Sequence, residues 1–334
     1  DGTKSFPEFR QYMIENFGKD EEAEIVTFKS ISYQEYTDQL DDDLVSGKDE
    51  IAVITVEGTI MEGSISQGVA GADGIVKQIR SAHENEDTKA IVFRVNSGGG
   101  SVIASEMMRD ELFEAKRKGI SVVVSMGDYA ASGGVYISTP ADYIFAEPTS
   151  ITGSIGVAIA FPTFENVTDY IGVNFDGVVT SRYGAWDPTQ PIDEDLDQIF
   201  NSSISGVYDR FIQFVADSRS QSYEDIKAIA GGRVWIGTAA EELGLVDEIG
   251  GVNEAIAHAA DFTKLTEYKV EYYGQEISSG ERLISGLLEG IGVSIQEPKI
   301  ISSLNSMQKF YESLIESRNP KVLLTCENCL IDLD

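Results

Sequence analysis

Three runs of β-branched and apolar residues alternate with amphipathic stretches, and this alternation restricts the fold more than any other feature of the chain. The runs cover residues 51–60, 89–97 and 120–127, and each predicts a buried strand. The stretches between them, near 73–84 and over 101–119, have the periodicity of helices. Strand, helix and strand at this spacing predict βαβ units, and therefore an α/β fold with a parallel sheet.

The segments on either side of this pattern differ from it in composition. Residues 1–45 predict a short helix, a small strand over 23–32 and an acidic linker. A long helix that ends at Arg219 and a last strand over 268–274 still belong to the α/β part. From 276 to 334 the sequence becomes amphipathic with glycine and serine breaks, which predicts a helical C-terminal tail.

The charge of the chain excludes several classes of partner. Fifty-six acidic residues against 25 basic ones give a formal net charge of −31. Binding of nucleic acid through phosphate neutralisation is therefore not expected, and docking on an anionic membrane surface is disfavoured. No run approaches the roughly 18 apolar residues of a membrane-spanning helix, and no signal-peptide pattern is visible. We interpret the acidic excess as a solvated surface.

The two cysteines, Cys326 and Cys329, form a C-x-x-C pair near the end of the sequence. A structural metal site needs about four ligands, and neither a histidine nor a second cysteine pair is nearby. A local disulfide or two free thiols are the states that this pair predicts. The sequence predicts no metal or cofactor.

Two glycine-rich turns follow adjacent predicted strands, at 96–101 ("NSGGGS") and 130–135 ("AASGGV"). Backbone amides free of side chains can stabilise a developing oxyanion. Ser132 stands in a small–x–Ser–x–Gly pattern on a strand-to-helix turn, which is the arrangement of a nucleophile elbow. The chemical interpretation predicts an exposed Ser132 hydroxyl facing two unobstructed amides. The structural alternative is a tight turn that packs a helix on a sheet.

A serine nucleophile needs a base, and the sequence offers few. His83 lies in a polar helix end, where we expect it to face solvent, and His258 lies on an alanine-rich helix face. Lysine can act as a base when burial lowers its pKa. However, no lysine occurs between Lys118 and Lys227.

Four segments resemble one family in order along the chain. They are "RVNSGGGSVIASE", "VVVSMGDYAASGGVYIS", "ADYIFAEPTSITGSIGV" and "GGRVWIGTAAEELGLVDEIGG". From about residue 30 to about residue 275 the chain is similar to the C-terminal repeat of the long, two-repeat form of signal peptide peptidase A. This family comprises bacterial Ser-Lys peptidases. The resemblance implies a Clp-protease/crotonase-like parallel sheet built from ββα units, with a C-terminal helical extension.

The resemblance also implies roles for particular residues. Ser132 matches the nucleophile, Gly133 and Gly99 match the two oxyanion donors, and Ser154 matches a hydroxyl that orients the general base. Gly98 stands where the family usually has proline, which loosens the backbone of that loop. No cofactor is implied.

The resemblance divides the chain into three parts. Residues 1–45 would be the tail of a preceding repeat plus its linker, 46–275 the nucleophile half of the peptidase domain, and 276–334 the helical tail. Short-form members carry their lysine near the position of Arg182, and arginine cannot act as the base. The long form takes the lysine from its N-terminal repeat, which would then be a partner of this chain.

The function implied is a serine endopeptidase that degrades cleaved signal peptides and other unfolded apolar peptides. The family further implies a homo-oligomer, expected to be a tetramer, at the periplasmic face of the bacterial inner membrane. Two other functions are open at this point. The chain alone can be an inactive scaffold or binding half, or it can be a crotonase-type acyl-CoA enzyme, which uses a similar pair of amides.

Overall fold

The computed structural model describes residues 5–21, 25–31, 36, 47–66, 68–160, 163–172, 186, 189–274 and 323–325. The chain divides into two compact units, Asp1–Ser46 and Gly47–Asp334. The first unit contains the predicted helix, α1 (Phe6–Phe17), whose N-terminus is capped because the Ser5 N–H donates to the Glu8 carboxylate. Where a small strand is predicted over 23–32, the described residues form only an isolated bridge between Lys19 and Phe28.

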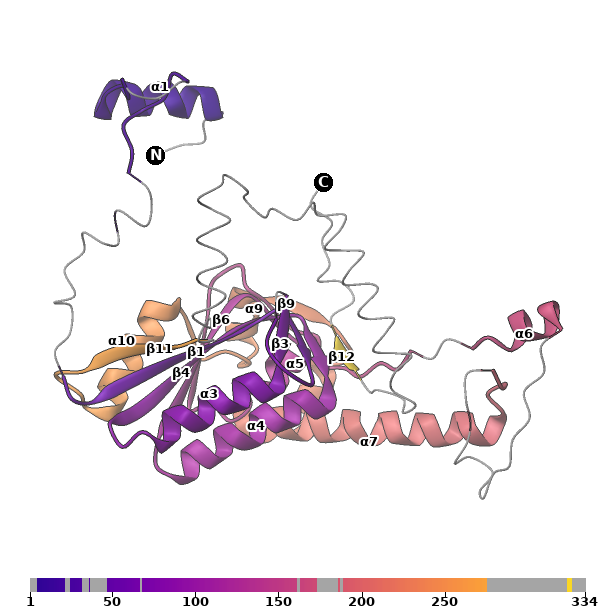
Figure 1. Ribbon diagram of the computed structural model, residues 1–334. Helices are drawn as coiled ribbons and strands as arrows, with labels where there is room; N and C mark the ends of the chain where they lie inside the picture. Colours follow the sequence, from indigo (N-terminus) through magenta and orange to yellow (C-terminus); the bar gives the residue numbers. More distant parts are fainter. Residues whose placement is uncertain are drawn as a thin grey trace. The chain divides into compact units, whose positions relative to one another are not determined.

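The second unit is built on a main sheet with the strand order β10-β7-β6-β4-β1-β11, in which all neighbours are parallel (Figure 1). These strands are β1 (Glu50–Glu57), β4 (Thr88–Ser97), β6 (Ser121–Ala131), β7 (Tyr143–Ala146), β10 (Glu248–Ile249) and β11 (Lys269–Tyr273). A short strand, β8 (Ile151–Gly153), runs parallel to the end of β6. It pairs in turn with the antiparallel β9 (Val234–Ile236).

A smaller sheet lies beyond the ends of these strands, with the order β12-β5-β2-β3. Its members are β2 (Thr59–Met61), β3 (Val69–Gly71), β5 (Gly99–Ser101) and β12 (Leu323–Thr325). In two successive units a main-sheet strand continues into a strand of the small sheet and then into a helix: β1 leads through β2 and β3 to α3, and β4 leads through β5 to α4. This confirms the predicted parallel sheet of ββα units.

The first predicted strand, over 51–60, is two strands because Gly58 breaks it. Gly58 has φ +94°, and a Cβ there would lie 2.3 Å from the Gly68 carbonyl oxygen. Only glycine fits such a close approach in that conformation. The break turns the chain from the main sheet into the small one, toward the candidate site.

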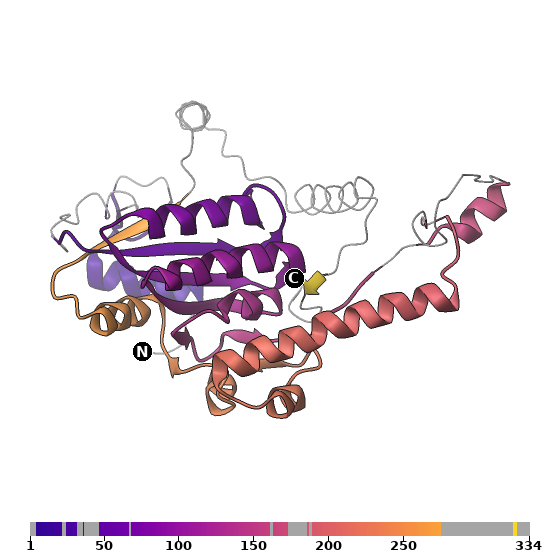
Figure 2. The ribbon, with the colours of Figure 1, turned by 90° about the horizontal axis from the view of Figure 1, so that it is seen from below.

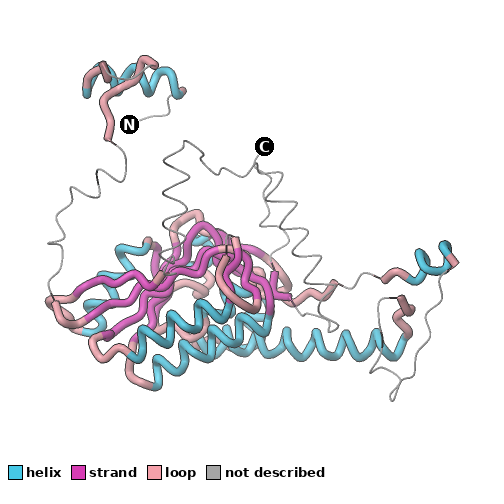
Figure 3. The backbone as a smooth tube through the Cα atoms, in the orientation of Figure 1, coloured by secondary structure: helices cyan, strands magenta, loops and turns pink. Residues whose placement is uncertain are grey.

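Helices cover both faces of the main sheet (Figures 1 and 3), and alternate residues of its strands belong to two different hydrophobic cores. Ala52 and Ile54 belong to the core under α3 (Ala72–Glu84) and α4 (Val102–Arg117). Ile51 and Val53 belong to a second core under α10 (Val252–Thr263). The near-continuous apolar runs predicted from sequence therefore reflect strands buried on both faces.

The remaining helices are α5 (Gly133–Ser138), α6 (Glu165–Ile171), α7 (Glu194–Arg219), α8 (Tyr223–Ile229) and α9 (Gly237–Glu242). The C-terminal part of α7, the long helix in Figure 2, packs on the first core through Phe211, Ile212 and Val215. Within the described residues, no helix has the length and apolar character needed to cross a membrane. Of the predicted C-terminal helical tail, only Leu323–Thr325 is described, and these residues form a strand.

Candidate active site

The two predicted glycine-rich turns lie against each other at one edge of the main sheet. A Cβ added to Gly133 would lie 3.0 Å from the Gly99 Cα and 3.1 Å from the Gly100 nitrogen. Contacts of this length leave no room for a side chain at position 133. Ser132 and Gly133 follow β6, whereas Gly99 follows β4. The structure therefore brings together residues from the ends of two different strands.

Ser132 stands on the tight turn between β6 and α5. Its N–H donates to the Gly153 carbonyl at 2.8 Å, and its own carbonyl accepts from the Tyr136 N–H at 3.0 Å. The backbone angles are φ 52° and ψ −111°. The turn thus holds Ser132 in a conformation that residues with a side chain rarely adopt.

Backbone strain distinguishes two serines from the rest of the described chain. Four described non-glycine residues have positive φ: Ser132, Ser154, Ser220 and Lys264. Ser220 and Lys264 are left-handed caps at the C-termini of α7 and α10, an ordinary place for that conformation. Ser132 and Ser154 follow the adjacent parallel strands β6 and β8, in which Ala131 is level with Gly153. Strain that capping does not explain concentrates at functional sites.

The Ser132 hydroxyl is buried without a hydrogen-bond partner. The residue is 0% exposed, and its Oγ forms no hydrogen bond to any described residue. The prediction of an exposed hydroxyl is wrong for this conformation, because all six residues of α5 are buried and the Gly99 turn packs against them. A buried polar atom without a partner is uncommon in folded proteins, and a catalytic role is one explanation for it.

The two candidate amides differ in their surroundings. The Gly133 N–H is the first of α5, a position that has no partner within a helix. The Gly99 N–H donates to the Ser97 Oγ at 3.1 Å, so it is not unobstructed as predicted. The Ser97 hydroxyl accepts this hydrogen bond from the residue two positions later, which is a common role of serine side chains in turns. An oxyanion at Gly99 would replace or share this bond.

Several residues that support the turns were not identified from the sequence. The register of β4 and β6 shifts between Val95 and Ser97, and the Asn96 Oδ1 accepts from the Tyr129 N–H at 3.2 Å within this irregularity. Ser105 Oγ donates to the Ser101 carbonyl, and a Cβ on Gly133 would lie 3.0 Å from that Oγ. The only signal for these roles is the position of polar residues beside glycines, which is common in turns.

Neither histidine is bonded to Ser132. His83 is 6% exposed; its Nε2 lies 2.7 Å from the Glu111 Oε1, and its Nδ1 lies 2.8 Å from the Lys118 Nζ. The expectation that His83 faces solvent is wrong, since α3 and α4 enclose it. His258 stacks on Tyr143 on the α10 side of the sheet.

The lysines that flank the lysine-free span also have other partners. Lys118 contacts His83, and the Lys227 Nζ lies 5.3 Å from the centre of the Tyr223 ring. Arg182, Cys326 and Cys329 lie outside the described residues. In the part of the chain that the structure describes, no group of three or more histidine, cysteine or carboxylate side chains is placed to hold a metal.

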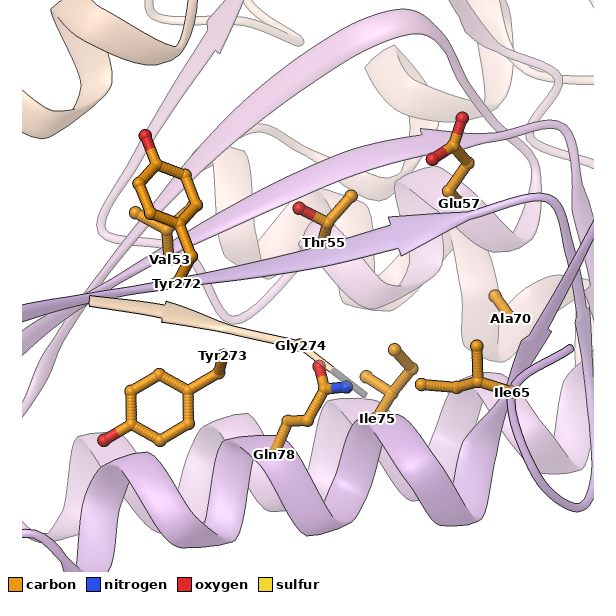
Figure 4. Close-up of a pocket in the computed structure, with 10 residues that line it drawn as sticks. All are labelled: Val53, Thr55, Glu57, Ile65, Ala70, Ile75, Gln78, Tyr272, Tyr273 and Gly274. Carbon is orange, nitrogen blue, oxygen red and sulfur yellow. The ribbon is translucent and has the colours of Figure 1, made fainter. Parts of the chain in front are cut away.

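A cavity of about 260 Å³ lies at the edge of β1, away from these turns (Figure 4). Ile75 and Gln78 of α3 line it, together with Tyr273 at the end of β11. None of the four predicted site residues is among its lining residues. The candidate site is therefore defined by the glycine turns and not by this cavity.

The chain is similar to a known protein family and to several known proteins. The profile of peptidase family S49 matches residues 114–266, which include Ser132 and Ser154. Protease 4 of Haemophilus influenzae is 38% identical over 313 residues, which cover 90% of this chain and 50% of that protein. A "putative protease" of Synechocystis sp. is 33% identical over 230 residues, covering 68% of this chain and 79% of that protein.

A "putative signal peptide peptidase SppA" of Enterococcus faecium is 29% identical over 311 residues, which cover 83% of this chain and 89% of that protein. Against the Haemophilus protein, by contrast, the chain spans only half of the relative's length.

Proposed function

Because the chain belongs to peptidase family S49, we propose that it carries the nucleophile half of a serine peptidase and forms an acyl-enzyme on Ser132. The observation that supports this most is the Ser132 turn. Its strained backbone, and its buried hydroxyl without a hydrogen-bond partner among the described residues, have no role in folding that the hydrogen bonds or packing reveal. Both features are consistent with a catalytic residue.

The proposed reaction begins with attack of the Ser132 Oγ on a peptide carbonyl carbon. A base takes the hydroxyl proton as the new C–O bond forms, and the amides of Gly99 and Gly133 bind the oxyanion. Each such donor is commonly worth about 3 kcal/mol in the transition state. The C–N bond then breaks as the base passes the proton to the leaving amine. Water hydrolyses the resulting ester and restores the serine.

We assign the base to a lysine on a preceding repeat that is not part of this sequence. Two observations support this assignment. No lysine occurs between Lys118 and Lys227, and the chain spans only half of the Haemophilus relative. We assign the orientation of such a lysine to Ser154, one strand away from Ser132, because Ser154 matches the family motif.

The proposed substrates are cleaved signal peptides and other extended apolar peptides. The resemblance and the name of the Enterococcus relative support this class. We also propose that the protein forms a homo-oligomer, expected to be a tetramer. We expect it to lie at the periplasmic face of the bacterial inner membrane.

A second candidate is that the chain by itself is an inactive half that only binds peptides or positions a partner. The complete burial of Ser132 favours it, because a substrate carbonyl cannot reach the hydroxyl in this conformation.

Labelling with a fluorophosphonate, whose phosphorus is attacked by activated serines with loss of fluoride, separates the two candidates. We expect Ser132 to be labelled when a preceding repeat carrying the lysine is joined to the chain, and peptide cleavage to appear with it. Ser132→Ala should lose both, whereas Ser203→Ala, at an exposed serine on α7, should keep both. Cleavage that survives Ser132→Ala would reject the peptidase proposal. Labelling of the chain alone would reject the inactive half.

A further inference from the structure

The two proposed oxyanion amides lie on separate turns, and each turn leads directly into a helix. Gly99 is the first residue of β5, which runs into α4 at Val102, and Gly133 is the first residue of α5. Both N–H groups must point at one oxygen atom, and sites of this kind tolerate an error of about 0.5 Å. The position of α5 relative to α4 therefore helps to decide whether the two amides converge.

Two side chains of α4 are bonded to α5. The Glu106 carboxylate accepts from the Tyr136 hydroxyl at 2.6 Å, and the Arg109 Nε donates to the Thr139 Oγ1 at 3.0 Å. Glu106 and Arg109 lie one helical turn apart, with the Arg109 Nη1 3.5 Å from the Glu106 Oε1. Together these four residues, which we call the α4–α5 link, hold α5 on α4 at its fourth residue and at its C-cap.

Tyr136 connects the link to the nucleophile turn. Its N–H donates to the Ser132 carbonyl at 3.0 Å, so a displacement of Tyr136 also displaces that turn. The residue is 1% exposed, and the centre of its ring lies 5.1 and 5.5 Å from those of Phe211 and Phe214 on α7. Packing thus fixes the place of the ring, and the hydrogen bond to Glu106 fixes its direction.

The Arg109 guanidinium is enclosed by aromatic rings. Its carbon lies 3.5 Å from the centre of the Phe214 ring and 4.7 Å from that of Phe113, and the side chain is 11% exposed. Cation–π contacts of this kind strengthen as the cation loses water. An apolar side chain would fill the same space without the cost of burying a charge. The hydrogen bond to Thr139 adds a fixed direction between the two helices, which an apolar contact lacks.

We infer that Glu106 and Arg109 are positioning residues for the proposed acyl transfer. Neither forms a hydrogen bond with the Ser132 Oγ. They hold α5 against α4, and this keeps the Gly133 amide at the separation from the Gly99 amide that binding of one oxyanion requires. The inference rests on the proposed function and adds to it two residues of α4 that lie outside the glycine turns.

The test uses the chain joined to a preceding repeat that carries the lysine. Tyr136→Phe and Glu106→Ala each remove the hydrogen bond between these two side chains, whereas Glu106→Gln keeps an oxygen that can accept it. Arg109→Met removes the guanidinium. The matched control is Tyr223→Phe, because the Tyr223 hydroxyl also donates to a carboxylate at 2.6 Å, that of Asp209, but between α8 and α7.

The measurement is kcat and KM for cleavage of an apolar peptide. Dividing the rate by the amount of Ser132 that a fluorophosphonate labels at completion removes the effect of a smaller folded fraction. We expect Tyr136→Phe, Glu106→Ala and Arg109→Met to lower kcat about tenfold with KM unchanged, because a misplaced amide weakens binding of the transition state. Glu106→Gln should stay within about twofold of the unaltered protein, and Tyr223→Phe should match it.

Three results would overturn the inference. The first is an unchanged kcat in Tyr136→Phe. The second is an equal loss in Tyr223→Phe, which would indicate general destabilisation. The third is a tenfold loss in Glu106→Gln, which would show that the hydrogen bond to the hydroxyl is not the cause.

Amide hydrogen exchange over 133–138 separates this inference from the peptidase proposal, because it needs no catalysis. We expect faster exchange in Tyr136→Phe than in Tyr223→Phe. If that difference is found while Ser132 is never labelled, the link holds the turn and the peptidase proposal fails. If Ser132 is labelled but Tyr136→Phe changes neither kcat nor exchange, the peptidase proposal stands and the positioning inference fails. Absence of both labelling and the exchange difference would reject both.

Discussion

At the scale of single residues, two buried serines near the same sheet edge behave in opposite ways. Ser150 Oγ donates to the Gly127 carbonyl at 2.6 Å and accepts from the Glu147 N–H at 3.0 Å. Ser132 Oγ has neither kind of bond among the described residues, and its backbone has positive φ. The hydrogen bonds of Ser150 stabilise its turn, whereas we expect the positive φ and unpartnered hydroxyl of Ser132 to lower stability.

We expect Ser132→Gly to raise the free energy of unfolding by about 1 kcal/mol, because glycine relieves the positive φ and removes an unpartnered hydroxyl. Ser150→Ala should lower it by about 1–3 kcal/mol, because two buried hydrogen bonds are lost. Urea unfolding of both variants measures the difference. A loss of stability in Ser132→Gly as large as in Ser150→Ala would show that position 132 is not strained.

At the scale of elements, a cluster around Glu50 joins the beginning of β1 to its neighbours. The Glu50 side chain is 1% exposed and lies 2.8 Å from the Lys269 Nζ of β11. It also accepts from the Thr88 Oγ1 of β4 and from the Tyr273 hydroxyl of β11, each at 2.7 Å. Burial opposes ionisation, but the hydrogen bonds from Lys269, Thr88 and Tyr273 outweigh it and hold the pKa of Glu50 below its ordinary value.

This lowered pKa predicts the direction of a pH effect. Glu50 stabilises the fold above its unfolded-state pKa of 4.5, and this contribution is lost as the pH falls through the lower folded-state pKa. At neutral pH we expect Glu50→Gln to lower the free energy of unfolding by about 2 kcal/mol, since Lys269 and Tyr273 lose a charged partner.

Urea unfolding at several pH values measures this contribution, with Glu271→Gln at an exposed position of β11 as the control. The difference in the free energy of unfolding between Glu50→Gln and the unaltered chain should become smaller below pH 4.5. A gap that stays constant through the acid range would contradict an ionised Glu50 in this cluster.

At the scale of the whole molecule, the net charge of −31 is the dominant electrostatic property. Like charges on a folded chain repel each other, and salt screens this repulsion.

We therefore expect the melting temperature to rise by several degrees between about 0.01 M and about 0.5 M NaCl, as the screening length shortens from roughly 30 Å to a few ångströms. Differential scanning calorimetry at both salt concentrations measures the shift. A flat or falling melting temperature would mean that attractive ion pairs outweigh the repulsion.

Much of the fold follows from local sequence patterns. The runs at 51–60, 89–97 and 120–127 predict the central parallel strands, and the amphipathic stretches predict α3 and α4, because burial on one or two faces imposes a periodicity on neighbouring residues. The glycine-rich turns and the position of Ser132 after a strand are visible for the same reason. A break between two strands, such as the one at Gly58, is harder to predict from the sequence, because it depends on which distant backbone atoms approach the glycine.

By itself the sequence determined the strands, the helices between them and the candidate residues Gly99, Ser132, Gly133 and Ser154. Only the tertiary structure decided that Gly99 meets Ser132 and Gly133, and that the Ser132 hydroxyl is buried without a partner among the described residues. It also decided that His83 is enclosed by Glu111 and Lys118, and that β12 lies on β5. These contacts join residues far apart in the chain, so they depend on packing that no local pattern records.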